Sequence, residues 1–204
     1  MKDKIDAIRA HYEHRITPGR AHYDVLDWAS AASQRRRFEV LVDNVPLAGK
    51  SLLDIGCGLG DLAALLDERA LAVEYTGVDV LARMVDACRE RFPARRFVRA
   101  DLFAGDDAPG EAWDVVYCSG AFNLDLGNNM AFLARAIRRM LDLSREHVVF
   151  NLLHARSPCL EEGYFSYDPA EVLALLPPAA GEVRILDDYL PNDFTVFCRK
   201  PPTA

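Results

Sequence analysis

A glycine-rich turn between a predicted strand and a predicted helix constrains the fold of this chain most strongly. The apolar run Ser51–Ile55 leads directly into Gly56, Gly58 and Gly60, and a stretch with helical spacing of apolar residues begins at Asp61. Glycines in this position let a backbone approach a ligand closely and present its amides to it. The spacing G-x-G-x-G lacks the third glycine of a dinucleotide fingerprint, and a carboxylate at the helix start repels phosphates. The turn therefore predicts a ligand site and disfavours a pyrophosphate.

Apolar runs and helical stripes alternate along the rest of the chain. The runs predict strands at 51–55, 74–78, 96–100, 114–118, 147–152, 183–189 and 194–199, and the stripes predict helices at 61–69, 82–91, 128–143 and 169–176. This alternation is typical of an α/β protein with a mostly parallel sheet covered on both faces. Residues 190–193 are too few for a crossover helix, so the last strand should form an antiparallel hairpin with the sixth. We expect a three-layer, doubly wound, seven-stranded sheet with one antiparallel strand.

The domain organisation follows from length and from the pattern ahead of the glycine turn. The chain has 204 residues, 50% of them hydrophobic, which suits a single core. Residues 23–45 carry apolar positions at helical spacing, with Ser33 as a break or cap. We therefore expect one domain over 1–204, with helices in a preface or lid at 1–48 and a ligand-binding core at 49–200.

Composition excludes several classes of function. A net charge of −7 disfavours binding to nucleic acid. No apolar run approaches the ~20 residues of a membrane span, and no secretory signal is visible, so we expect a cytoplasmic protein that does not enter membranes. The cysteines are far apart in sequence, which predicts neither a disulfide framework nor a metal site; they are Cys57, Cys88, Cys118, Cys159 and Cys198.

Two aspartates end neighbouring predicted strands. Asp79 follows the second strand, 19 residues after Gly60, and Asp101 follows the third. An acid at the first position can accept hydrogen bonds from both hydroxyls of a ribose. Either aspartate alone is equally typical of a cap or a turn. Together, beside the glycine turn, they predict a site for a nucleoside without phosphates.

Four motifs in order, LDIGCGLG, YTGVDV, RADL and WDVVYCSGAFN, resemble those of the class I S-adenosylmethionine-dependent methyltransferases. The resemblance extends from Leu52 to Arg199 and implies a Rossmann-like, seven-stranded fold. It implies S-adenosylmethionine as cofactor and S-adenosylhomocysteine as product. Asn123 lies near the place of the NPPY motif of amino methyltransferases acting on adenine or glutamine, but Asn-Leu-Asp-Leu departs from that motif and argues against such substrates.

The resemblance also implies which residues hold the cofactor. The methionine and ribose would contact the glycine turn and the first two strand ends, namely Asp54, Gly56, Cys57, Gly58, Gly60 and Asp79. The adenine would lie among Val80, Met84, Asp101 and Leu102. Cys118 and Ser119 would offer backbone carbonyls to the methionine ammonium. In the preface, Trp28 is either a lid over the donor or a core residue. Arg37 is a hypothetical partner of the methionine carboxylate.

Residues beyond the later strand ends are candidates for the acceptor site. Those predicted to face a substrate are Phe122, Tyr164, Tyr167, Asp168, Tyr189 and Asp193. Asn123 and His154 are the catalytic candidates. An imidazole titrates near neutrality, which suits a general base, but a loop histidine that satisfies backbone groups is the alternative reading of His154. For Asn123 the alternative is a turn or helix cap.

The leading functional hypothesis is methyl transfer to a small molecule, with N, O or S as the acceptor atom. Two other hypotheses remain open. The chain could instead methylate RNA or protein, or it could bind the cofactor without turnover, as a sensor or partner subunit. The glycine turn and both acids are compatible with all three.

Overall fold

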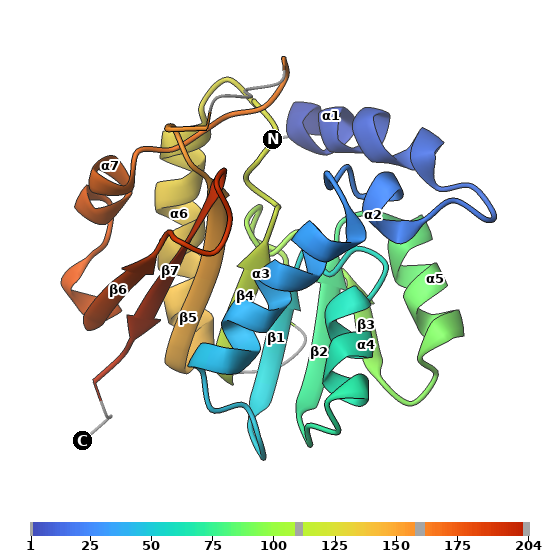
Figure 1. Ribbon diagram of the computed structural model, residues 1–204, viewed down its shortest axis with the longest axis horizontal. Coiled ribbons are helices and arrows are strands. Elements are labelled where there is room, and N and C mark those ends of the chain that lie inside the picture. Colours follow the sequence, from blue (N-terminus) through green and yellow to red (C-terminus); the bar gives the residue numbers. More distant parts are fainter. Residues whose placement is uncertain (1, 109–111, 158–161, 202–204) are drawn as a thin grey trace.

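The computed structural model describes residues 2–108, 112–157 and 162–201. Its core is a seven-stranded sheet with strand order β3-β2-β1-β4-β5-β7-β6 (Figure 1). The strands are β1 (Ser51–Ile55), β2 (Glu74–Asp79), β3 (Arg96–Arg99), β4 (Trp113–Ser119), β5 (Ser144–Leu153), β6 (Glu182–Leu186) and β7 (Asp193–Arg199). The first five are parallel, and β7 lies antiparallel between β5 and β6. The predicted fold class and the antiparallel last strand are confirmed.

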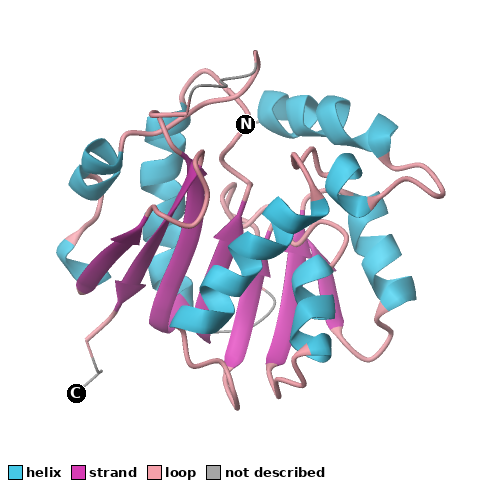
Figure 2. Cartoon of the chain, viewed as in Figure 1, coloured by secondary structure: helices cyan, strands magenta, loops and turns pink. Residues whose placement is uncertain are grey.

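Helices cover both faces of the sheet (Figures 1 and 2). The longer elements are α1 (Lys2–Tyr12), α3 (Ala31–Asn44), α4 (Asp61–Glu68), α5 (Ala82–Arg91) and α6 (Asn129–Leu143). The short ones are η1 (Glu13–Arg15), α2 (His22–Val25), α7 (Pro169–Ala174) and η2 (Pro178–Ala180). Side chains of α3, α4 and α5 pack in one hydrophobic cluster, and those of α6 and α7 pack in the cluster on the opposite face.

The sequence explains why these elements form. In α6, Phe132, Leu133, Ala136, Ile137 and Met140 recur at helical spacing, and all are buried against the sheet. The central strand β4 is buried from 115 to 118 because helices cover both of its faces. Because these two apolar patterns are strong, the predicted bounds of α6 and β4 agree closely with the observed ones.

The N-terminal region differs from the expectation. Residues 23–45 do not form one helix with a break or cap at Ser33, because α2 ends at Val25 and α3 begins at Ala31. Ser30 is the N-cap, and Ser33 is its partner in a reciprocal capping box. Helices do precede the core, as expected, but the bounds of α1 were not predicted, although Ile5, Ile8 and Tyr12 have the spacing of one helical face.

Cys57, Cys88, Cys118 and Cys198 are buried as free thiols, and Cys159 lies outside the described residues. None of the helices in the described ranges combines the length and hydrophobicity that crossing a bilayer requires.

Candidate functional site

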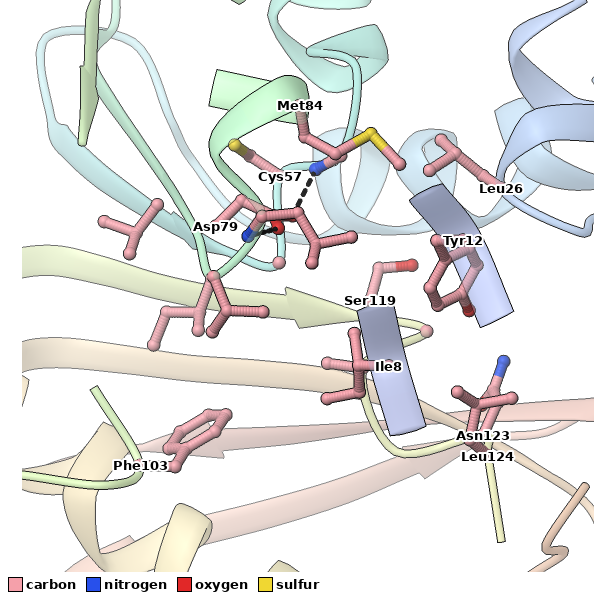
Figure 3. A pocket seen from close by; sticks show the side chains of 18 of the residues that line it. Ile8, Tyr12, Leu26, Cys57, Asp79, Met84, Phe103, Ser119, Asn123 and Leu124 are labelled. Atoms are coloured by element: carbon pink, nitrogen blue, oxygen red, sulfur yellow. Dashed lines mark hydrogen bonds between the residues drawn. The ribbon is translucent and has the colours of Figure 1, made fainter. Parts of the chain in front are cut away.

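A cavity of about 150 Å³ lies at the carboxyl ends of the central parallel strands. Residues at the ends of β1, β2 and β4 line it, and α1 lies across this edge of the sheet (Figures 1 and 3). The chain proceeds outward from β1 through β2 to β3, and then returns to place β4 on the other side of β1. Such a switch in strand order is where doubly wound sheets bind ligands. The cavity is therefore the candidate functional site.

The glycine turn forms one wall of this cavity. Gly56 and Gly58 have φ angles of +76° and +54°, which L side chains rarely adopt. A Cβ atom on Gly58 would lie 2.9 Å from a methyl carbon of Leu26. The amides of Gly56 and Cys57 donate to the Val78 carbonyl at 2.8 and 3.1 Å. The turn is thus bare backbone fixed against β2, with Leu26 packed against Gly58, and its residues 56–58 line the cavity.

Asp79 ends β2 beside this turn. Its Oδ2 accepts the Gly58 amide at 3.0 Å, and its Oδ1 accepts the Leu81 amide at 2.9 Å (Figure 3). Each carboxylate oxygen retains a further lone pair. Burial raises the pKa of Asp79 to about 6, although the backbone amides favour its charged form. The carboxylate can therefore accept two hydrogen bonds from neighbouring hydroxyls of a ligand.

Asp54 lies on β1 and also lines the cavity. It is 3% exposed, and Tyr75 Oη donates to its Oδ2 at 2.6 Å. Burial raises the pKa of Asp54 to about 7, and the charge of Asp79 acts in the same direction. A positive ligand group would offset this penalty, because it favours the carboxylate form.

The end of β3 and the start of α5 complete this half of the cavity. Asp101 Oδ1 accepts the amides of Phe103 and Ala104 at 3.1 and 2.9 Å, so its side chain orders the following turn. Val80, Met84 and Leu102 line the same region as apolar walls. In Figure 3, Asp79 and Met84 lie at one end of the cavity and Asn123 at the other.

Asn123 follows β4 and is 6% exposed. Its Oδ1 has no hydrogen-bond partner among the residues that the structure describes, although the atom is buried in the cavity wall. Leaving such an atom unpaired costs about 1–3 kcal/mol. Ser119, the last residue of β4, lines the same region. A ligand that donates a hydrogen bond to Asn123 would remove this penalty.

The N-terminal elements cover the cavity. Ile5, Ile8 and Tyr12 of α1 line it, together with Trp28 from the loop before α3. A Cβ atom on Gly120 would lie 2.7 Å from the Trp28 ring, so the glycine allows the indole to contact the β4 turn. Trp28 thus lines the cavity and packs against the β4 turn, and its role as a lid over the donor stays a prediction.

A cluster of polar side chains adjoins the end of the cavity where Asn123 lies. Asp27 accepts a hydrogen bond from Arg15 at 2.7 Å on Oδ1, and its Oδ2 lies 2.9 Å from His11 Nε2. Tyr164 Oη donates to the same Oδ2. Asp27 and Tyr164 line the cavity. Asp27 and His11 were not among the predicted site residues, since nothing in the sequence brings positions 11, 27 and 164 together.

Arg37 and Asp193 do not line the cavity. They pair with each other, and their side chains are 3% and 0% exposed. The Arg37 guanidinium also lies 4.3 Å from the centre of the Trp28 ring. Arg37 was expected to bind the methionine carboxylate and Asp193 to face the substrate. In the structure each of the two side chains is the charged partner of the other. Their contribution to the site is indirect, through support of Trp28.

His154 follows β5 outside the cavity lining. Its Nδ1 accepts the Arg156 amide at 3.1 Å, and its ring contacts Phe194 edge to face. Burial lowers the pKa of His154, which favours the neutral ring. This geometry matches a histidine that satisfies loop backbone, and it does not place the imidazole at the cavity as a base.

The remaining predicted residues outside the cavity lining have structural contacts of their own. Gly60 precedes α4 with φ +77°, and Cys118 is fully buried in β4. Tyr167 donates to the Phe122 carbonyl at 2.8 Å, and Phe122 packs in an aromatic cluster. Asp168 caps α7, and Tyr189 lies 2.8 Å from Thr195 Oγ1. Folding therefore brings together the donor-side candidates other than Gly60, Cys118 and Arg37, while of the six predicted substrate residues only Tyr164 lines the cavity.

The lining defines the chemistry that the cavity accepts. It contains four carboxylates, Asp27, Asp54, Asp79 and Asp101, and Lys4 is the only lysine or arginine among the described lining residues. At the start of α4, Asp61 binds His22, Gln34 and Arg91. This arrangement suits an uncharged nucleoside with a cationic extension and is unsuited to phosphates. Fold and site define a nucleoside-binding protein of the doubly wound α/β class.

Comparison with known proteins narrows this class. Residues 52–143 match the family described as "Methyltransferase domain". A putative methyltransferase of Mycobacterium tuberculosis is 32% identical over 157 residues, which cover 74% of this chain and 93% of that protein. Trans-aconitate 2-methyltransferase of Paracidovorax citrulli is 38% identical over 102 residues, which cover 47% of this chain but only 39% of that enzyme. The chain thus matches about two fifths of the trans-aconitate enzymes.

Solved structures support the same fold. The N-methyltransferase NodS of Bradyrhizobium japonicum, in complex with S-adenosyl-l-homocysteine, has a TM-score of 0.68 at 16% identity, covering 95% of this chain and 97% of NodS. Magnesium protoporphyrin IX methyltransferase of Synechocystis, with bound SAM, has a TM-score of 0.66 at 14% identity, covering 98% of each chain. The chain belongs to the class I S-adenosylmethionine-dependent methyltransferases.

Proposed function

We propose that this chain transfers a methyl group from S-adenosylmethionine to a small-molecule acceptor. The observation that carries the proposal is the cavity bordered by bare glycine backbone, with the Asp79 carboxylate free to accept two more hydrogen bonds. The described lining carries four carboxylates and one lysine, so it would repel the phosphates of a dinucleotide. A nucleoside with a positively charged substituent fits this cavity better.

The lining residues suggest how the donor is held. Asp79 would accept the two ribose hydroxyls, and the adenine would lie between Met84 and Leu102 beside Asp101. The methionine end would extend past Gly56 toward Ser119, with its ammonium near the acidic Asp54. Gly60 and Cys118 would act through the backbone of the turn and of β4, since neither lines the cavity.

The protein would contribute to the reaction by positioning the donor and the acceptor and by excluding water from the cavity. When bound, S-adenosylmethionine supplies an electrophilic methyl group on a positively charged sulfur. Trp28 and the α1 residues Ile8 and Tyr12 cover the cavity with apolar surface, which keeps water away from the reacting atoms. Holding two reactants in line is sufficient for a large part of the acceleration.

A small acceptor is favoured over RNA or protein. Helix α1 lies across the cavity and its residues Ile5, Ile8 and Tyr12 line it, which suits a small ligand, and the net charge of −7 disfavours RNA. We further propose that the chain is one domain, with 1–48 as its lid region and 49–200 as its core. We also propose a cytoplasmic location, which the buried free thiols support.

The trans-aconitate relatives suggest one specific acceptor, a tricarboxylate. Among the residues that the structure describes, however, the lining offers four carboxylates and one lysine, Lys4, which lies over the Phe132 ring. Like charges at close range are unfavourable. We therefore propose an acceptor other than trans-aconitate.

Labelled S-adenosylmethionine and a size-fractionated metabolite extract test the proposed function. We expect label in small metabolites. Label in RNA or protein would support macromolecular methylation, and absence of any labelled product, despite donor binding, would support a sensor or partner subunit. Titration with S-adenosylmethionine, S-adenosylhomocysteine and NADH tests the donor assignment, which uptake of NADH alone would contradict.

Binding of S-adenosylmethionine should strengthen as the pH rises from 6 to 8. The pKa values of Asp54, about 7, and Asp79, about 6, are raised in the empty site, so both carboxylates take up protons as the pH falls through these values. The ammonium requires charged Asp54, whose ionised fraction rises about tenfold over this interval. Calorimetry should show this gain in affinity and proton release at pH 7.

The variant Asp54→Asn is the control for the pH dependence. It removes the group that titrates near pH 7, so most of the dependence should disappear while affinity at pH 8 falls. Affinity that stays constant or decreases from pH 6 to 8 in the unmodified protein would show that neither carboxylate has to ionise.

A further inference from the structure

We propose that the acceptor is an amine, and that Tyr164, oriented by Asp27, accepts a hydrogen bond from its N–H group. This inference rests on the proposed methyl transfer and specifies its substrate class. It starts from the polar cluster at the Asn123 end of the cavity, which the donor-side residues leave unused.

Asp27 is positioned by its backbone and by three donors. Its φ of +59° is unusual for a residue other than glycine, which indicates that the surrounding structure holds it in place. The carboxylate contacts Arg15, His11 and Tyr164, which come from η1, α1 and the loop before α7. The aspartate thus connects three separate segments around one side of the cavity.

The contact with Asp27 determines what the Tyr164 hydroxyl can do. A tyrosine has one hydroxyl hydrogen, and here Asp27 Oδ2 receives it. The oxygen also lies 3.4 Å from His11 Nε2, but that nitrogen lies closer to Asp27 Oδ2, at 2.9 Å, so towards a ligand the tyrosine oxygen is left as a hydrogen-bond acceptor. Burial, with the hydrogen bond to Asp27, raises the pKa of Tyr164, so the group is a neutral hydroxyl at physiological pH. It is suited to bind an N–H group and unsuited to act as a phenolate base.

A second hydrogen-bond acceptor, Asn123 Oδ1, lies on the segment that pairs with Tyr164. Leu124 and Tyr164 form an antiparallel bridge, and the Phe165 amide donates to the Asn123 carbonyl at 2.7 Å. This pairing holds Asn123 Oδ1, which lacks a partner among the described residues, close in the fold to Tyr164. Both residues line the cavity. Two acceptor oxygens in one wall match the two hydrogens of a primary amine.

The charge of the lining favours the same substrate class. A carboxylate acceptor would enter among Asp27, Asp54 and Asp79, and a phenol or thiol has a single hydrogen to donate. An amine offers two hydrogens and can arrive with a proton, which the acidic surroundings favour. An amine that arrives as an ammonium has no lone pair, so it first releases one proton to solvent. The neutral amine nitrogen then forms the bond to the methyl carbon while the carbon–sulfur bond breaks and its electron pair stays on sulfur. The methylated ammonium that results can release a second proton to solvent.

The test uses ¹³C-methyl-labelled S-adenosylmethionine, the protein of residues 1–204 and a metabolite extract, with the products analysed by NMR. An N-methyl signal is expected, whereas an O-methyl or S-methyl signal as the main product would overturn the amine inference and leave the proposed function standing. Absence of a labelled small molecule, with intact donor binding by calorimetry, would overturn both.

Variants assign the amine contact to Tyr164. In Tyr164→Phe we expect KM for the purified acceptor to rise about tenfold, the loss of one hydrogen bond, with donor affinity changed less than twofold. Asp27→Ala should raise the same KM, and Asp27→Asn, whose amide oxygen can still accept the tyrosine hydrogen, should restore part of it.

Tyr189→Phe is the matched control, because that hydroxyl contacts Thr195 outside the cavity lining and its loss should leave acceptor KM unchanged. Melting temperatures report whether each variant folds. An unchanged acceptor KM in folded Tyr164→Phe, or equal effects of Asp27→Ala and Asp27→Asn, would contradict the assigned roles.

Discussion

Replacing Asp79 with alanine should weaken S-adenosylmethionine binding by at least about 100-fold. The carboxylate is the only group at the end of β2 that can accept both proposed ribose hydroxyls, and hydrogen bonds to a charged group contribute about 1.5–3 kcal/mol each. The same carboxylate also receives the amides of Gly58 and Leu81, so its loss loosens the turn that lines the cavity. Calorimetric titration of the purified variant measures the effect.

Two further aspartates provide controls for this prediction. Asp101→Asn should cost less than about tenfold, because the Asp101 side chain mainly holds the amides of Phe103 and Ala104. Asp86→Asn, on the exposed surface of α5, should leave affinity unchanged. If Asp79→Ala bound the cofactor within fivefold of the unmodified protein, the ribose assignment would be wrong.

Asp193→Ala should lower the free energy of unfolding by about 3–5 kcal/mol, the cost of leaving a buried charge unpaired. Asp193 is fully buried and accepts hydrogen bonds from Arg37 and, at 2.9 Å, from Asn151. Without Asp193, the guanidinium of Arg37, which is 3% exposed, keeps the Ser33 carbonyl and the Trp28 ring as neighbours but has no counter-charge there. Urea denaturation at constant pH measures the difference.

The double variant Arg37→Met with Asp193→Ala separates charge from packing. Removing both partners should recover a large part of the lost stability, because no unpaired charge remains. Glu68→Ala, which breaks the exposed pair with Arg35, should have little effect. If the double variant were as unstable as the sum of both single variants, charge pairing would not be the cause.

The ion pair of Arg37 and Asp193 should also affect the cavity, because it holds Trp28, a lining residue, in place. Trp28 lies between the Arg37 guanidinium and Gly120, so the pair supports a wall of the cavity. This explains how residues that the sequence suggested as ligand contacts can matter for binding without touching a ligand.

Local patterns were sufficient to predict the sheet, and they also predicted residues that the fold gathers around one cavity; that these residues hold the donor stays a prediction. A strand that runs into Gly56, Gly58 and Gly60 places bare backbone at the edge of a parallel sheet whatever the rest of the chain does. Asp79 and Asp101 follow strand ends, and parallel strands bring their carboxyl ends to one edge. Periodicity also predicted α6, because its apolar stripe is long and uninterrupted.

Residues whose roles depend on distant partners were not predictable. Arg37 and Asp193 are 156 positions apart, and their pairing depends on how α3 packs against β7. Helix α1 is short and polar on average, so its apolar face at Ile5, Ile8 and Tyr12 acquires meaning only against the cavity. The same holds for His154, whose position after a strand end suggested chemistry but whose ring contacts the Arg156 amide and the Phe194 ring outside the cavity lining.

The sequence by itself determined the order of strands and helices, the glycine turn and the acids at the strand ends, because these features depend on neighbouring residues and on a period of two or 3.6. Only the tertiary structure decided that α1 covers the cavity, that Arg37 is neutralised by Asp193, and that His11, Asp27 and Tyr164 meet. The physical reason is that burial and charge pairing between distant segments depend on packing, which no local pattern encodes.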